Sequence, residues 1–311
     1  MTSRKPEDLA RLGTEQANRA AADLDRKSAL QIVRIINAED AKVARAVKRA
    51  LPQIARAIDW TADALNQGGR LIYVGAGTSG RIAALDAAEC PPTFNVDPEM
   101  VQFIIAGGAK ALGSAVEANE DSRELGEREI AKKRPGRKDV VIGIAASGRT
   151  PFTIAAVEYA RKRGARTVAV TCNPKSPLES AAELAIVTEV GPEVVAGSSR
   201  MKAGTAQKMV LNLISTGAMT RLGYVYGNLM VNVHPKNFKL TERALGIISN
   251  ITGENRTAAE GILKAAGSVP VAIVMHQAAV TRSQAERALQ STGGNVRRAI
   301  ALSQAGHNES A

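Results

Sequence analysis

Glycines and hydroxyl side chains cluster in one turn, and this combination can bind an anion. The turn Gly75-Ala-Gly-Thr-Ser-Gly80 follows Leu71–Val74, which has the composition of a buried strand. Helix-forming residues run from Ile82 to Glu89, and Pro91 and Pro92 are expected to end that helix. The free N–H groups and dipole of a helix start attract anions, and glycine lets a ligand approach the backbone. The predicted anion site includes Gly77, Thr78 and Ser79.

Two nucleotide-binding alternatives share part of this pattern. The spacing Gly75-x-Gly77-x-x-Gly80 fits the dinucleotide fingerprint, which also needs an acidic residue at the end of the next strand. The next apolar run, Met100–Ala106, leads into Gly107-Gly108-Ala109-Lys110 without such an acid. A P-loop needs Gly-Lys-Ser or Gly-Lys-Thr, which does not follow the turn. The sequence therefore favours a compact phosphate ligand.

Two further hydroxyl-rich turns precede predicted helices. Ser147-Gly148-Arg149-Thr150 lies before a helix starting near Pro151, and Gly197–Thr205 lies before the helical stretch Ala206–Thr220. One such turn is most often a plain loop, and any single hydroxyl can simply cap a helix. Three of them in one domain favour a phosphosugar. The candidate contacts in these turns are Ser147, Gly148, Thr150, Ser198, Ser199 and Lys202.

Strand and helix patterns alternate through the middle of the chain. The expected strands are Leu71–Val74, Val101–Ala106, Val140–Ala145, Thr167–Thr171 and Leu184–Glu189. Such alternation predicts an α/β fold with a doubly wound, mainly parallel sheet that binds ligands at the carboxyl ends of its strands.

Helical patterns flank this core on both sides. Residues 8–36 have helical spacing, Asn37–Asp40 is expected to cap, and Ala41–Leu65 reads as an amphipathic helix broken near Pro52. Short amphipathic helices follow Leu240. The predicted domains are an N-terminal helical segment at 1–50, a phosphosugar-binding domain at 51–239 and a C-terminal helical module at 240–311.

Composition limits the class of protein. The chain has 311 residues, 45% of them hydrophobic, and no apolar run approaches the roughly 18 residues that span a membrane. Two cysteines, Cys90 and Cys172, are too few for a disulfide framework, so we expect a cytoplasmic protein without a membrane partner. The histidines are distant in sequence and suggest no metal site.

The formal net charge of +11 raises the possibility of nucleic-acid binding. Its basic residues are dispersed, except in Lys132–Lys138, which reads as a solvated connection before a strand. Aromatic residues, which stack on bases, make up only 3% of the chain. We therefore expect no nucleic-acid partner, because an anionic small molecule accounts for the charge equally well.

Several long motifs resemble one enzyme family. Gly75–Arg81, Ala88-Glu-Cys-Pro-Pro-Thr93, Gly143–Pro151, Gly197–Lys208 and Gly227-Asn-Leu-Met-Val231 are similar to the N-acetylmuramic acid 6-phosphate etherases. The match runs from about residue 12 to beyond residue 300. It implies a sugar isomerase (SIS) fold, a C-terminal region similar to a ubiquitin-associated domain, and kinship with the glucokinase regulatory protein.

The resemblance also implies a reaction, the cleavage of the lactyl ether to give N-acetylglucosamine 6-phosphate and D-lactate during cell-wall sugar recycling. Lactate would be eliminated across C2–C3 of the open-chain sugar before water adds, with a carboxyl acid and a carboxyl base and without metal or redox cofactor. Glu89 matches the family's proton donor. The residues alone leave the base open among Glu117, Glu120 and Asp121, and these acids could equally form a solvated helix face. The family motif places the base at Glu120.

Two other functions use the same turns. An SIS-type hexose-phosphate isomerase needs a similar base and the same phosphate cradle, and a non-catalytic sugar-phosphate sensor needs only the cradle. The pair Glu89 and Glu120 favours an enzyme over a sensor. SIS-type proteins resembling this one often build their sites with a neighbouring subunit, so a homodimer is expected.

Overall fold

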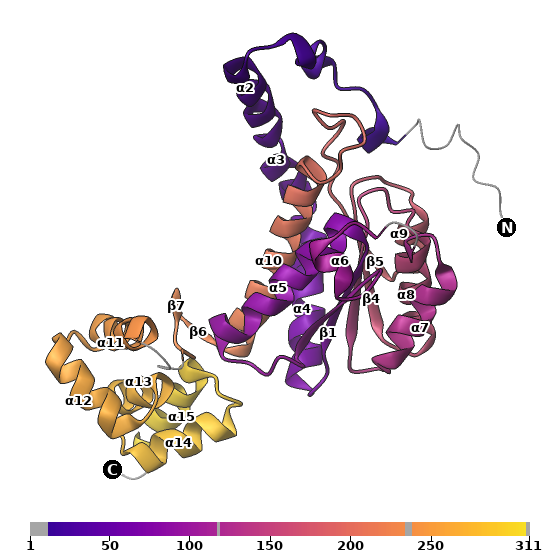
Figure 1. Cartoon of the computed structure of the whole chain (residues 1–311). Coiled ribbons are helices and arrows are strands. Elements are labelled where there is room, and N and C mark those ends of the chain that lie inside the picture. The colour runs from indigo at the N-terminus through magenta and orange to yellow at the C-terminus, as the bar shows by residue number, and fades with distance from the viewer. Residues whose placement is uncertain (1–11, 117–118, 234–237, 309–311) are drawn as a thin grey trace. The chain divides into compact units, whose positions relative to one another are not determined.

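A five-stranded parallel sheet forms the centre of the computed structural model, which describes residues 12–116, 119–233 and 238–308 (Figure 1). The strand order is β2-β1-β3-β4-β5. This is the doubly wound sheet that the sequence predicts, and the five expected strands are confirmed within two residues at each end. Their bounds are β1 Leu71–Gly75, β2 Val101–Ile105, β3 Val140–Ile144, β4 Arg166–Thr171 and β5 Leu184–Val187.

Both faces of the sheet are covered, which explains why its strands are almost continuously apolar. Ile72 and Val74 of β1 pack in a cluster with Phe152 of α8. Tyr73 lies between them and points to the opposite face, where its hydroxyl donates to Asp86 of α5 at 2.8 Å. The helices of this part after β1 are α5 Gly77–Phe94, α6 Lys110–Gly113, α7 Arg123–Lys132, α8 Pro151–Lys162, α9 Pro177–Ala181 and α10 Lys202–Leu222.

The N-terminal region differs from its predicted helix. Within the described part, residues 12–28 form three short 3₁₀ turns, at Gly13–Glu15, Arg19–Ala21 and Leu24–Arg26, so the prediction is wrong there. The reason is that the next helix has its own start signal after these turns. Ser28 and Gln31 form a capping box that starts α2 only at Ala29.

The following helices are α2 Ala29–Asp40, α3 Val43–Arg49 and α4 Leu51–Asn66. The expected cap at residues 37–40 is wrong, because these residues form the last turn of α2 and Glu39 is buried there. The predicted break near Pro52 is confirmed. Proline fits the first turn of α4, where a missing N–H costs no hydrogen bond.

Helix α5 runs through both prolines that were expected to stop it. Pro91 and Pro92 occupy its last turn, and the helix ends at Phe94, before Asn95 with φ +52°. Prolines remove two hydrogen bonds there. The turn is held instead by tertiary contacts: Phe94 is buried, and the Asn232 side-chain amide donates to the Phe94 carbonyl oxygen at 2.7 Å.

The chain divides into two compact units, and each is described by itself. Unit 1 comprises residues 1–88 and 98–215, and unit 2 comprises residues 89–97 and 216–311. The boundary predicted at residue 240 assigns residues 216–239 to the phosphosugar-binding domain, whereas the contacts within the chain assign them to unit 2. Unit 2 contains a hairpin, β6 Val225–Tyr226 and β7 Leu229–Met230, and the helices α11 Phe238–Thr252, α12 Arg256–Ala266, α13 Val269–Ala278, α14 Arg282–Ser291 and α15 Val296–Asn308.

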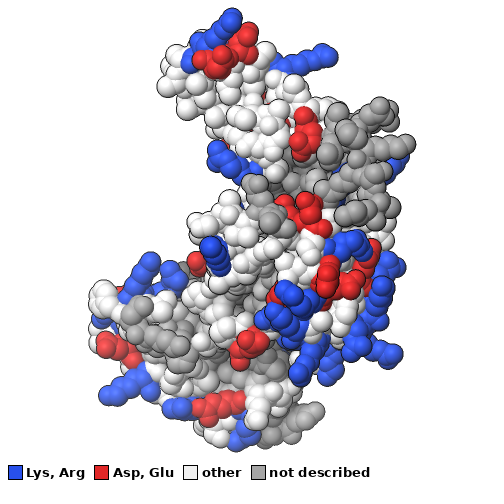
Figure 2. All heavy atoms as spheres, turned by 45° about the vertical axis from the view of Figure 1, so that its right-hand side comes forward, with Lys and Arg blue, Asp and Glu red and all other residues white. Residues whose placement is uncertain are grey.

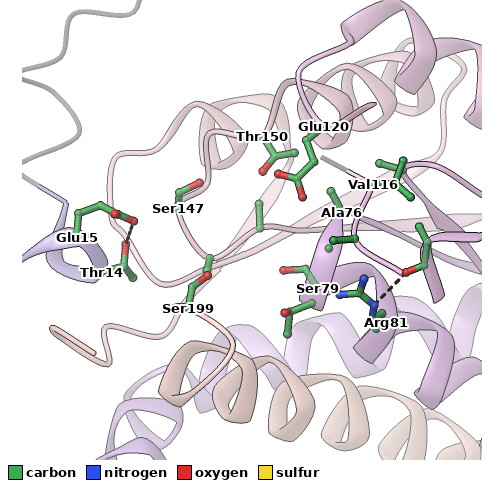
Figure 3. A pocket seen from close by; sticks show the side chains of 17 residues that line it. Thr14, Glu15, Ala76, Ser79, Arg81, Val116, Glu120, Ser147, Thr150 and Ser199 are labelled. Carbon is green, nitrogen blue, oxygen red and sulfur yellow. Dashed lines mark hydrogen bonds between the residues drawn. The ribbon is translucent and has the colours of Figure 1, made fainter. Parts of the chain in front are cut away.

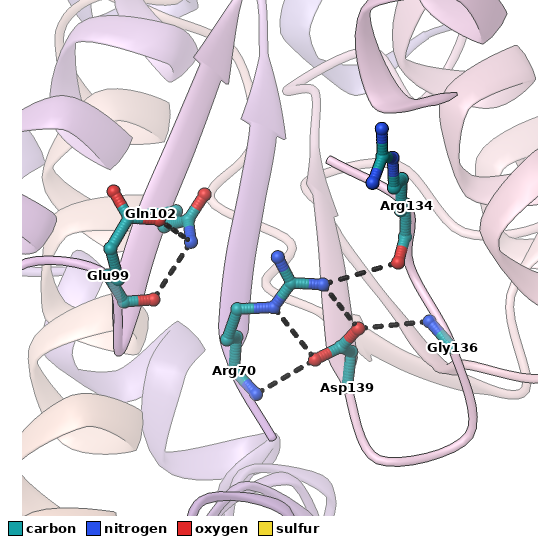
Figure 4. Close-up of polar contacts among 6 residues, drawn as sticks. All are labelled: Arg70, Glu99, Gln102, Arg134, Gly136 and Asp139. Atoms are coloured by element: carbon teal, nitrogen blue, oxygen red, sulfur yellow. Dashed lines mark hydrogen bonds and ion pairs between the residues drawn. The ribbon is translucent and has the colours of Figure 1, made fainter. Parts of the chain in front are cut away.

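An ion pair joins β1 and β3 where these strands begin (Figure 4). Asp139 accepts from the Arg70 guanidinium at 3.1 and 2.8 Å and from the Arg70 backbone N–H at 2.9 Å. It also accepts from the Gly136 N–H at 2.9 Å. These contacts raise the pKa of Arg70 above its ordinary value through the Asp139 hydrogen bonds. They fix the strand register at the edge opposite the carboxyl ends.

Charges of both signs are interspersed on the face drawn in Figure 2. In the described part of the chain, no single helix is long and apolar enough to cross a membrane. One bent pair, α12 with α13, passes the length and composition test only when its two helices are taken together, and they meet at 103°.

Candidate active site

A cavity of about 340 Å³ opens at the carboxyl ends of the strands (Figure 3). Ala76, Ala106 and Ala145 line it directly after β1, β2 and β3. Small side chains at these positions leave room for a ligand against the sheet edge, the place where open α/β sheets bind their ligands. All lining residues belong to unit 1.

The cavity brings together seven of the eleven predicted site residues. They come from four separate segments, and they are Gly77, Thr78, Ser79, Glu120, Ser147, Thr150 and Ser199. Gly148, Ser198, Lys202 and Glu89 do not line it. Of the open candidates for the base, Glu117 lies outside the described residues, and exposed Asp121 is not among the lining residues.

Glu120 lies against the first residue of α5. A Cβ atom built on Gly77 would lie 3.0 Å from Glu120 Oε1, so the carboxylate closely approaches the helix start, and φ +51° at Gly77 favours glycine there. The Glu120 backbone is fixed too, because its carbonyl oxygen accepts from the Phe152 N–H at the start of α8 at 3.0 Å. The partial positive charge of the α5 N-terminus thus lies beside a carboxylate.

Hydroxyl groups on several sides of the cavity remain able to contact a ligand. Thr150 is the N-terminal cap residue of α8, but its side chain makes no capping hydrogen bond. Ser147 Oγ accepts from the Arg149 N–H at 3.1 Å, which leaves its O–H to donate. Buried Ser79 Oγ lies 3.0 Å from the Gln207 side-chain oxygen, so this hydroxyl is held in place by α10.

Gly148 shapes its turn from outside the cavity. It is buried with φ +66°, and a Cβ there would lie 2.3 Å from Ser176 Oγ and 2.7 Å from Thr171 Oγ1. Gly148 therefore packs against Ser176 and Thr171 and does not line the cavity. The turn needs a glycine so that its flanking residues Ser147 and Thr150 can reach the cavity.

Lys202 is buried in a different environment. Only 1% of its side chain is exposed, and its Nζ donates to Glu39 Oε2 of α2 at 2.6 Å. The start of α10 is also occupied, because the buried Glu193 carboxylate accepts from the Lys202 and Ala203 N–H groups at 3.0 and 2.9 Å. The N–H groups of this helix start are therefore already bonded to a carboxylate of the protein itself.

The Lys202–Glu39 pair makes a testable contribution to stability. Burial raises the pKa of Glu39, but hydrogen bonds from Lys202 and Lys42 outweigh it and lower that pKa from 4.5 to about 2. Stabilisation by this carboxylate is therefore complete above pH 4.5 and is lost as the pH falls toward 2. Lys202→Met is expected to lower the free energy of unfolding by about 3–5 kcal/mol at pH 7, because it removes the buried partner of Glu39 and leaves, among the described residues, only the exposed Lys42 ion-paired with this buried carboxylate.

Urea unfolding at pH 7 and pH 3 measures this effect. Lys42→Met is the matched control, because Lys42 contacts the same carboxylate with a side chain that is 58% exposed, and we expect a loss of about 0–1 kcal/mol. Equal losses of unfolding free energy in the two variants would contradict the assignment of Lys202 as the stabilising partner of Glu39. If Lys202 instead held the ligand, its loss would raise KM and leave stability unchanged.

Glu89 does not belong to the unit that contains the cavity. It is exposed and belongs to unit 2, whereas Gly77 starts the same helix in unit 1. The carboxylate of Glu89 is thus not among the groups that unit 1 gathers around the cavity.

The sequence reasoning missed three polar residues of the cavity, which are Thr14, Glu15 and Arg81. Arg81 donates to the carbonyl oxygens of Ala111 at 2.9 Å, Leu112 at 3.3 Å and Ser114 at 2.8 Å, at the end of α6. It therefore ties the wall of the cavity to α5. Arg81 directly follows the glycine-rich turn, and this position could have identified it as a site residue. Nothing in the residue spacing near Thr14 indicates a site.

The described residues contain no group of three or more His, Cys, Asp or Glu that could hold a metal ion. Cys90 and Cys172 are both buried, and neither forms a disulfide. Burial raises the pKa of the Cys172 thiol to about 12, so it stays protonated.

Family models match the central part of the chain. The glucokinase regulatory protein N-terminal SIS domain matches residues 53–161, and the SIS domain matches residues 131–216. Among solved structures, a phosphoheptose isomerase from Francisella tularensis is 17% identical with a TM-score of 0.47, covering 60% of this chain and 98% of that one.

Relatives match over nearly the whole length. An N-acetylmuramic acid 6-phosphate etherase of Escherichia coli O1:K1 is 52% identical over 94% of this chain and 98% of its own. The etherases of Symbiobacterium thermophilum and Aeromonas hydrophila are 56% and 50% identical, over 86% and 92% of this chain and 89% and 97% of their own. The expected SIS fold is confirmed, and the chain belongs to the N-acetylmuramic acid 6-phosphate etherase family.

Proposed function

We propose that this protein cleaves the lactyl ether of N-acetylmuramic acid 6-phosphate and releases D-lactate and N-acetylglucosamine 6-phosphate. Family membership supports the reaction. The observation that carries it within the structure is the Glu120 carboxylate, which packs against the start of α5 inside a cavity rich in hydroxyl groups. Such a cavity combines an anion cradle with a base.

We assign the phosphate and the sugar hydroxyls to the N–H groups at the start of α5 and to the hydroxyls of Thr78, Ser79, Ser147, Thr150 and Ser199. Neutral hydroxyls and a helix start bind a phosphate without a buried cation. Ser198 and Lys202 lie outside the cavity and do not enter this assignment.

Glu120 is the proposed base. It removes the proton at C2 of the open-chain sugar, the C3–O ether bond breaks, and the lactate oxygen takes a proton from the acid, for which we propose Glu89. Water then adds its oxygen to C3 while a proton returns to C2, so the second step reverses the proton movements of the first. Neither step changes an oxidation state overall.

We propose that a second copy of the chain supplies Glu89 to each cavity in a homodimer. Two observations support this. Glu89 is exposed in unit 2 and so is accessible to a neighbouring chain, and apolar side chains of unit 1 are exposed on several helices. The most exposed of those on helices are Leu30, Val33 and Leu85, at 56%, 54% and 53%. A partner subunit that covers such side chains gains hydrophobic free energy. Two buried cysteines that form no disulfide suit a reducing compartment, so we place the reaction in the cytoplasm.

Incubation of the purified protein with N-acetylmuramic acid 6-phosphate in oxygen-18 water tests the reaction. We expect unlabelled D-lactate and one oxygen-18 atom at C3 of N-acetylglucosamine 6-phosphate, because cleavage is on the sugar side of the ether oxygen. A control incubation of unlabelled product measures exchange at C1. Label in the lactate would contradict elimination, and binding without lactate release would indicate a sensor.

A further inference from the structure

The cavity contains a second carboxylate that the proposed mechanism does not use. Among the described lining residues, only Glu120 and Glu15 carry carboxyl groups. Figure 3 shows them apart, with Ser147 between them in this view. Glu15 belongs to the 3₁₀ turn Gly13–Glu15, so a short N-terminal segment contributes to a cavity that is otherwise built from the sheet domain.

The position of this turn is fixed by hydrogen bonds to the edge of the cavity. Thr14 is only 1% exposed, and its Oγ1 accepts from the Asn173 side-chain amide, after β4, at 3.2 Å. Its carbonyl oxygen accepts from the Gly197 N–H at 3.3 Å. The Asn18 side-chain amide donates to the Pro192 carbonyl oxygen at 3.1 Å. These three contacts hold residues 14–18 against loops that follow β4 and β5.

The Glu15 carboxylate makes little hydrogen bonding to the described residues of the protein. Among the described residues its one hydrogen-bond partner is Thr14 Oγ1, at 3.5 Å, the outer limit for such a bond. Gly197 has φ +75°, and a Cβ there would lie 3.1 Å from Glu15 Oε2, so the loop that carries Ser199 closely approaches the carboxylate. A carboxylate whose backbone is held in place, and whose oxygens make only this one long contact among the described residues, is suited to accept hydrogen bonds from a ligand.

We propose that Glu15 is a substrate-contacting residue that determines specificity: its carboxylate accepts hydrogen bonds from sugar hydroxyls and keeps anionic groups away from its side of the cavity. This inference rests on the proposed function, whose substrate carries a phosphate and a lactyl carboxylate. A fixed negative charge repels both groups and attracts hydroxyl donors. Glu15 therefore decides which way round the doubly anionic sugar lies in the cavity.

Calorimetric titration with N-acetylglucosamine 6-phosphate and with inorganic phosphate tests this role without turnover. For Glu15→Gln we expect Kd for the sugar phosphate to rise about tenfold, because charge-assisted hydrogen bonds become neutral ones. Kd for inorganic phosphate should stay equal or fall, because a repulsive charge is removed. Glu15→Asp should keep the weak phosphate binding of the wild type, since it keeps the charge.

Asp25→Asn is the matched control, because Asp25 is an exposed carboxylate of the same N-terminal segment that does not line the cavity. It should leave both dissociation constants unchanged. Unchanged sugar-phosphate binding in Glu15→Gln, or equal weakening of both ligands, would overturn the proposal. Thermal unfolding of each variant identifies a loss of fold, in which case Glu15→Asp decides the question. Lactate release by the wild-type protein is assayed separately, so failure of the proposed function is distinguished from failure of this inference.

Discussion

Glu120→Gln is expected to reduce the rate of D-lactate release by about 10²- to 10⁴-fold, the usual contribution of a general base. The amide keeps the size of the side chain but cannot take the proton from C2. Because Glu120 packs on Gly77 and is fixed through the Phe152 N–H, the substituted side chain should stay in place and the protein should remain folded. The measurement is a coupled lactate assay at saturating substrate.

A second readout separates loss of the base from loss of binding. Wild-type protein should exchange the C2 proton of N-acetylglucosamine 6-phosphate for deuterium in heavy water, and Glu120→Gln should not, although both bind this sugar with similar Kd. Asp121→Asn is the neighbouring control, because Asp121 does not line the cavity. Undiminished turnover in Glu120→Gln would remove this residue from the mechanism.

Mixing two inactive variants is expected to restore activity. Glu89→Gln and Glu120→Gln should each be nearly inactive alone. If each cavity combines Glu120 of one chain with Glu89 of another, a mixed dimer has one cavity with both glutamates and one with neither. Random exchange of subunits in a two-fold dimer should then recover about a quarter of wild-type activity.

The experiment uses subunits mixed at equal concentration, with lactate release followed over the time of exchange. A control mixture of Glu120→Gln with itself should stay inactive. If both glutamates of a cavity came from the same chain, every cavity in a mixed dimer would lack one of them. Persistent inactivity, with mixed dimers demonstrated by mass, would therefore contradict the composite site.

The central fold was open to prediction because its signals are local and repeated. Each strand is an apolar run bounded by polar residues, and the turns at Gly77 and Gly148 need glycine for reasons that act within a few residues. The five strands and their order of alternation with helices follow from such signals. The helix α8 starts at Pro151 as expected, because proline is suited to the first turn.

The structure differs from the sequence-based prediction where contacts between residues far apart in the sequence determine the local conformation. Nothing local reveals that Glu193, nine residues before Lys202, occupies the start of α10, or that Lys202 pairs with Glu39 from another helix. The 3₁₀ turn with Glu15 is placed by Asn173 and Gly197, which lie far along the chain. The helical end at Phe94 is likewise stabilised by Asn232, so the two prolines do not stop α5.

Helix α5 also constrains how this chain can be divided by genetic engineering. Unit 2 is assembled from two pieces of sequence, residues 89–97 and residues 216–311, and the contact between Asn232 and Phe94 joins them. A fragment that begins after residue 215 therefore lacks part of its own unit, and the complementary fragment keeps a stretch whose partners are gone. The C-terminal helices are not a contiguous cassette that could be removed or exchanged, and a transplant would have to carry the end of α5 with it.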